Sequence, residues 1–207
     1  MAGLTIDLNL YADEATLIDA LLAGDKHACA CMVRQHGGQM YAVALRIMGD
    51  PDEAEDVVQD AFISACGKVA SFEGRSKLST WLYRITTNAA LMRLRKRRDD
   101  TVSLDEPQVG DDGDLLPRQL GDWEIDPGRQ ALSSELRQEM EAAVESLPPS
   151  LRAAFVLRDI QGLSTQEAAE ALEISETALK VRLHRARLAL RERLAGYLAG
   201  QPQEIAP

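Results

Sequence analysis

Apolar residues recur along much of the chain at the three- and four-residue spacing of amphipathic helices. The most regular stripe follows a helix-breaking Gly-Asp-Pro run at residues 49–51 and consists of Ala54, Val57, Val58, Ala61, Phe62 and Ala65. Similar patterns predict helices near residues 13–22, 26–48 and 78–98. Alternating runs rich in Val, Ile and Thr are missing, so the sequence predicts an all-α protein.

A long acidic segment divides the predicted helices into two groups. Residues 99–130 hold ten acidic and two basic residues, together with Pro and Gly clusters and no helical periodicity. This composition is typical of a flexible linker. We therefore expect two small helical domains, at residues 13–98 and 131–198, with tails at residues 1–12 and 199–207.

The formal net charge of −10 argues against nucleic acid as a partner, because phosphate binding depends on Lys and Arg. The distribution of charge changes this interpretation. Residues 74–98 contain eight basic residues and no acidic one, whereas most of the acidic surplus lies in the predicted linker. The predicted helix near residues 78–98 therefore offers a basic and polar surface that suits nucleic acid.

The end of the chain shows the pattern of a helix-turn-helix. Residues 164–167 (Ser-Thr-Gln-Glu) form a capping-box pattern that begins a short helix. After a turn at residues 173–175, a longer helix carries an apolar stripe on one side and a basic face on the other, as in a helix that enters the major groove. Glu173 stands where this turn usually has Gly. The alternative is an amphipathic helical hairpin with a solvated basic face.

Segments of both predicted domains resemble bacterial RNA polymerase sigma factors of the extracytoplasmic-function type. The similar segments are residues 52–62, 77–88, 147–149, 155–158, 162–164 and 181–187. The resemblance covers about residues 14–98 and 130–196, and it implies a sigma region 2 bundle followed by a sigma region 4 helix-turn-helix. It also implies a non-enzymatic polymerase subunit without a cofactor, which directs promoter-specific initiation.

The resemblance assigns core-polymerase binding to the acidic face of the helix after residue 51. The residues concerned are Glu53, Glu55, Asp56, Gln59 and Asp60. Such a face can pair with a basic coiled coil on the clamp of the beta-prime subunit. The alternative is a solvated polar face, which is common on helices.

The resemblance assigns minus-ten recognition and melting to the loop before residue 78 and to the helix that follows. The residues concerned are Phe72, Lys77, Ser79, Arg84, Asn88, Leu91 and Arg95. A cationic surface with a pocket lowers the cost of extruding an unpaired base. We expect the basic run at residues 93–98 to hold duplex phosphates. Trp81 lies on the apolar stripe, so we expect it to pack in the core rather than to stack on a base.

Minus-thirty-five recognition falls on the helix-turn-helix. The residues concerned are Thr165, Gln166, Lys180, Arg182, His184, Arg185 and Arg187. The resemblance implies three partners: core RNA polymerase, through the beta-prime clamp and the beta flap; promoter DNA; and an anti-sigma factor. The sequence also allows a conventional helix-turn-helix regulator that acts without being a polymerase subunit.

The three cysteines, Cys29, Cys31 and Cys66, are too few and too unevenly spaced to indicate a disulfide framework or a zinc site. His27 and Cys31 lie one helical turn apart, which could suggest a metal or redox site. We instead expect Cys29 and Cys66 to be small buried thiols. No apolar run is long enough for a membrane span, and the first residues lack the pattern of a signal peptide. We therefore expect a cytoplasmic protein.

Overall fold

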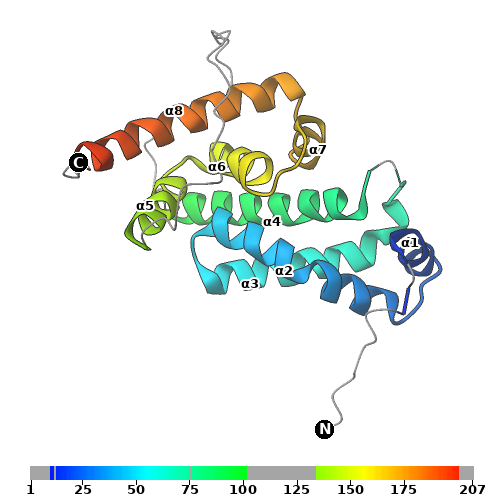
Figure 1. Cartoon of the computed structure of the whole chain (residues 1–207). Coiled ribbons are helices and arrows are strands. Elements are labelled where there is room, and N and C mark those ends of the chain that lie inside the picture. Colours follow the sequence, from blue (N-terminus) through cyan, green and yellow to red (C-terminus); the bar gives the residue numbers. More distant parts are fainter. Residues whose placement is uncertain (1–9, 12, 75, 102–133, 201–207) are drawn as a thin grey trace, which may run out of the picture.

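The computed structural model describes residues 10–11, 13–74, 76–101 and 134–200, and of residues 98–101, 134–136 and 196–200 only the backbone (Figure 1). Every regular element in these ranges is helical, which confirms the predicted all-α class. The helices are α1 (Glu14–Leu22), α2 (Ala28–Met48), α3 (Pro51–Lys68), η1 (Val69–Ser71), α4 (Leu78–Thr101), α5 (Ser134–Glu145), α6 (Pro149–Phe155), η2 (Val156–Ile160), α7 (Thr165–Ala171) and α8 (Glu176–Gly200). The predicted linker lies outside the described residues except at its start, where α4 continues to Thr101.

Local signals explain where the first helices begin and end. The Asp13 carboxylate accepts a hydrogen bond from the Thr16 amide at 2.8 Å, and the Asp50 carboxylate accepts one from the Glu53 amide at 3.0 Å. Each bond satisfies an amide that the first turn of the helix leaves unpaired. Helix α2 ends at Gly49, whose φ of +75° lies in the left-handed region that favours glycine.

Helices α2, α3 and α4 pack together around a continuous apolar core, with α1 against α2. Met32, Met40 and Leu82 are almost fully buried in this core. The Trp81 ring is 4% exposed and lies 5.4 Å from the Phe72 ring, measured between centroids. The structure therefore confirms that Trp81 is a core residue.

The second half of the chain contains the predicted helix-turn-helix. The Ser164 hydroxyl accepts a hydrogen bond from the Glu167 amide, and the Glu167 carboxylate accepts one from the Ser164 amide, so the predicted capping box begins α7. Leu179 and Leu183 on α8 are buried, as their spacing indicates. Glu173 in the turn has a φ of +54°, which agrees with the left-handed conformation expected at that position.

The two halves pack against each other. One cluster of buried residues extends from α1 to α8. Helix α7 packs against α4, and Figure 1 shows it above one end of that helix. The Arg152 guanidinium of α6 donates a hydrogen bond to the carbonyl oxygen of Ile47 in α2, at 2.7 Å. In the part of the chain that the structure describes, no helix is both long enough and apolar enough to cross a membrane.

Candidate nucleic-acid interface

The residues expected to read the minus-ten element lie mostly on one side of α4. Arg84, Asn88, Leu91 and Arg95 follow one another at intervals of four, three and four residues, which places them along one stripe of the helix. The Arg95 side chain is exposed, and the other three are partly buried. Lys77, just before the first turn of α4, is exposed at the same end. The structure thus assembles a cationic and polar stripe from residues predicted for one task.

Two residues predicted for the same task lie differently. Phe72 is 6% exposed and packs on Trp81, so its ring belongs to the core of this structure rather than to an open surface. Ser79 is partly buried in the first turn of α4. Sequence alone places Phe72 in a loop, and only the packing of that loop on α4 shows where the ring points.

The stripe on α4 is in contact with acidic residues of the helix-turn-helix. Lys77 Nζ lies 2.9 Å from Glu167 Oε1. Asn88 Nδ2 donates a hydrogen bond to Glu173 Oε2 at 3.0 Å, and Arg84 Nη1 lies 4.0 Å from Glu173 Oε1. We call these five residues the interdomain ion-pair cluster. Local sequence patterns do not predict this cluster, because its members come from two separate domains.

The pKa of Glu167 in this cluster is strongly shifted. Hydrogen bonding to the Ser164 amide, the hydrogen bond from Lys77 and the Ser164 hydroxyl together lower its pKa to about 2. The same carboxylate raises the pKa of Lys77, mainly through their hydrogen bond. Glu167 and Lys77 are therefore both charged near neutral pH. The charged Lys77 can also attract a phosphate at that pH.

The predicted polymerase-binding residues lie on α3 and divide into two groups. Glu55, Gln59 and Asp60 are exposed. Glu53 and Asp56 bind Arg93 of α4, whose Nε lies 2.5 Å from Glu53 and whose Nη2 lies 2.8 Å from Asp56. Arg93 was expected to hold phosphates with the rest of the basic run, but here it joins α4 to the acidic helix. Arg95 and Lys96 remain exposed.

The basic residues of α8 form the other predicted DNA surface. Lys180, His184, Arg185 and Arg187 are exposed, and Arg182 is partly buried. Arg187 makes a two-pronged contact with Asp159, at 2.9 and 2.8 Å, which fixes its guanidinium against the preceding helical segment. On α7, Gln166 is exposed and Thr165 is partly buried. The long helix therefore presents several cations on one rigid surface.

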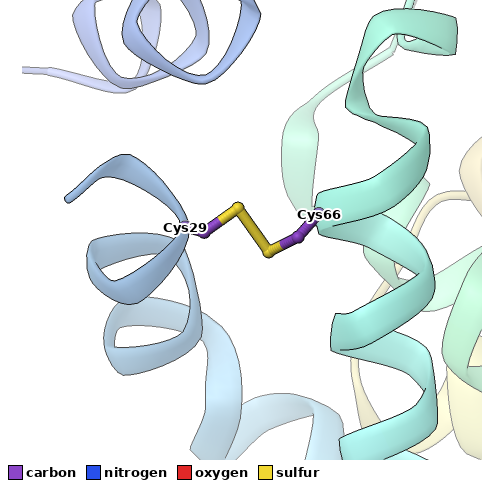
Figure 2. The surroundings of a disulfide bond; sticks show 2 residues. All are labelled: Cys29 and Cys66. Atoms are coloured by element: carbon purple, nitrogen blue, oxygen red, sulfur yellow. A yellow bond between two sulfur atoms is a disulfide. The ribbon is translucent and has the colours of Figure 1, made fainter. Parts of the chain in front are cut away.

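The cysteines differ from the prediction. Cys29 of α2 and Cys66 of α3 form a disulfide, with their Cα atoms 6.0 Å apart (Figure 2). The prediction of small buried thiols is therefore wrong for these two residues. Cys31 is buried and not disulfide-bonded. The pairing depends on how α2 packs on α3, which the spacing of the cysteines does not reveal. Within the described ranges, no group of three His, Cys, Asp or Glu residues is placed to hold a metal ion.

Comparisons with known proteins agree with this arrangement. The family model of Sigma-70 region 2 matches residues 32–99, and that of Sigma-70, region 4 matches residues 137–190. The match to region 2 rules out the conventional regulator that the helix-turn-helix alone allowed.

Individual relatives point the same way. The ECF RNA polymerase sigma factor SigW of Bacillus subtilis is 37% identical over 83% of this chain and 91% of its own length. The ECF RNA polymerase sigma-E factor of Escherichia coli K12 is 33% identical over 86% of this chain and 92% of its own. The solved structure of the sigma factor RpoE in complex with the anti-sigma factor NepR from Bartonella quintana has a TM-score of 0.57 and 28% identity, over 79% of this chain and 94% of that one. The chain therefore belongs to the extracytoplasmic-function sigma factors, which bind core RNA polymerase and direct promoter-specific transcription initiation.

Proposed function

We propose that the stripe on α4 reads and opens the minus-ten element. The observation that carries this proposal is the placement of Lys77, Arg84, Asn88, Leu91 and Arg95 along one side of a single helix. Asn can hydrogen-bond base edges, and the cations can receive the backbone of an unpaired strand. Phe72 and Ser79 act behind this surface, where Phe72 supports Trp81 and the start of α4.

The basic face of α8 then reads the minus-thirty-five element. Lys180, Arg182, His184 and Arg185 lie within two turns of a helix, so they can reach phosphates and base edges together. Thr165 and Gln166 at the start of α7 contact the backbone beside it. Arg187 is bound to Asp159 in the structure. It either contacts DNA after leaving Asp159 or positions α8 through that contact.

The exposed part of the acidic face on α3 binds the beta-prime clamp, and region 4 binds the beta flap. Glu55, Gln59 and Asp60 are free to meet basic groups of the clamp. Glu53 and Asp56 act there only together with Arg93, which already neutralises part of their charge. The protein itself has no catalytic role, and it works in the cytoplasm, where the polymerase is. RpoE of Bartonella quintana forms a complex with the anti-sigma factor NepR, and an anti-sigma factor binds this chain in the same way.

Run-off transcription tests this proposal. Bacterial core polymerase is incubated with a genomic promoter pool, with and without the protein, and with an Arg84→Ala, Asn88→Ala variant. We expect new start sites that require the protein and that decrease at least tenfold in the variant, since each lost contact contributes about 1–3 kcal/mol. The matched control is Arg34→Ala, which removes one exposed cation from α2, away from the stripe.

Two results would contradict the proposal. If the Arg34→Ala control loses as much activity as the double variant, the stripe on α4 has no special part in recognition. If the protein binds duplex DNA alone but not polymerase, the roles assigned to α3 and α4 are wrong.

A further inference from the structure

Part of the surface assigned to the minus-ten element is in contact with the domain assigned to the minus-thirty-five element. Lys77, Arg84 and Asn88 all meet carboxylates of the helix-turn-helix, at 2.9, 4.0 and 3.0 Å. Tyr83 lies on the same helix, and its hydroxyl is 3.5 Å from the side chain of Gln161. Three of the groups that would meet DNA are thus already paired within the molecule.

This arrangement cannot exist on a promoter. The two promoter elements are separated by about 25 base pairs, which corresponds to roughly 85 Å of duplex. In the structure, residues of the minus-ten surface are within hydrogen-bond distance of acidic residues of the helix-turn-helix. The 32 residues from 102 to 133 join the domains, and a chain of that length can span about 110 Å when extended. The domains can therefore separate far enough to bind both elements.

We propose that the interdomain ion-pair cluster is an autoinhibitory contact, in which the carboxylates of Glu167 and Glu173 take the places of DNA on Lys77, Arg84 and Asn88. This inference rests on the function proposed above. Carboxylates and phosphates accept the same charge-assisted hydrogen bonds, so the two compete for one set of donors. Release of the contact exposes the reading surface.

Glu173 makes the autoinhibitory contact a feature of this chain, because the turn usually has Gly at that position. Its φ of +54° is a conformation that residues with side chains rarely adopt, and glycine fits there without strain. The glutamate at this strained position meets both Arg84 and Asn88. A glycine would relieve the strain and remove the carboxylate, so it should favour the separated state on both counts.

A double variant, Glu167→Gln with Glu173→Gly, tests the proposal while keeping the cap of α7 and the backbone of the turn. Gln serves at the third position of a capping box as Glu does, so α7 keeps its start. Gly suits the backbone of the turn. The matched control is Asp19→Asn with Glu141→Gln, which removes the same two charges from exposed positions on α1 and α5. This control corrects for the general gain in DNA affinity that any loss of negative charge brings.

Two measurements on the full chain are needed. The first is the affinity for a fluorescein-labelled single-stranded 20-mer of randomised sequence, followed by anisotropy at low salt. The second is zero-length cross-linking with a carbodiimide, with mass spectrometry to detect an amide between Lys77 and Glu167 in the unmodified protein. Neither measurement needs a known promoter or the polymerase.

We expect the double variant to bind the oligonucleotide about tenfold more tightly than the control, because charged hydrogen bonds that hold the closed state are lost. We also expect the Lys77–Glu167 amide in the unmodified protein. Equal affinities of variant and control, or absence of the amide, would overturn the proposal. The run-off assay decides the proposed function separately, since it depends on new start sites and not on the affinity of the free protein.

Discussion

Arg152 is a buried cation that joins helices from both halves of the chain. It is 9% exposed, and its guanidinium donates to the carbonyl oxygens of Ile47 at 2.7 Å and Leu147 at 3.1 Å, and to that of Glu145. These oxygens belong to the ends of α2 and α5, where helices leave carbonyls unpaired. Burial lowers the pKa of Arg152. The five fixed donors of Arg therefore satisfy several helix ends at once.

We expect Arg152→Met to lower the free energy of unfolding by about 3 kcal/mol, because it leaves buried carbonyl oxygens without donors. Urea denaturation followed by circular dichroism measures this. Arg137→Met, at an exposed position on α5, is the control and should change the free energy by less than about 0.5 kcal/mol. Equal effects of the two substitutions would show that the guanidinium contacts do not stabilise the fold.

At the scale of single elements, α7 is a very short helix, and its formation depends on how its two ends are stabilised. Its seven residues begin at the capping box of Ser164 and Glu167, and the turn after it passes through Glu173. Short helices are marginal alone, so caps and tertiary contacts decide whether they form. Glu167 acts in both ways, since it caps α7 and binds Lys77.

This double role predicts an acid-sensitive contribution to stability. The folded state lowers the pKa of Glu167 from 4.5 to about 2, so the stabilisation is complete above pH 4.5 and is lost as the pH falls toward 2. We expect the stability difference between the unmodified protein and Glu167→Gln to shrink over this range, as measured by urea denaturation at a series of pH values. Glu170→Gln, on the exposed side of the same helix, controls for the loss of a charge. A difference that stays constant between pH 4.5 and 2 would contradict this role.

At the scale of the whole molecule, the disulfide links α2 to α3 and closes a long loop. Cys29 and Cys66 are 37 residues apart in the sequence. A cross-link of that span restricts the unfolded chain and so favours the folded one. Disulfides are rare in the cytoplasm, where a sigma factor works, and those that form there are usually transient. The stability of the folded chain therefore depends on the redox state of this bond.

We expect reduction of the Cys29–Cys66 bond to lower the free energy of unfolding by about 3 kcal/mol. Thermal unfolding with and without a phosphine reductant measures the effect, and free-thiol counting by mass spectrometry confirms the reduction. A Cys29→Ala, Cys66→Ala variant should unfold at the same temperature under both conditions. If the reductant leaves the unmodified protein unchanged, the bond does not stabilise the native state.

Much of the fold and of the family follows from local patterns. The stripe from Ala54 to Ala65 predicts α3, and the Ser164–Glu167 pattern predicts the start of α7 to the residue. Both depend on residues within a few turns of each other, where backbone geometry is nearly fixed. Arg93 could not be placed in this way. It looks like part of a basic run, yet it binds two acids of α3 that precede it by 40 and 37 residues.

The sequence by itself determined the helices and the family, because periodicity, capping and motif spacing are properties of neighbouring residues. Only the tertiary structure decided which distant side chains meet. Lys77 and Glu167 are 90 residues apart, and Asn88 and Glu173 are 85 apart. Such contacts arise from the packing of one helix face on another, and a small rotation of either helix would select different partners. The disulfide and the interdomain ion-pair cluster are therefore consequences of packing.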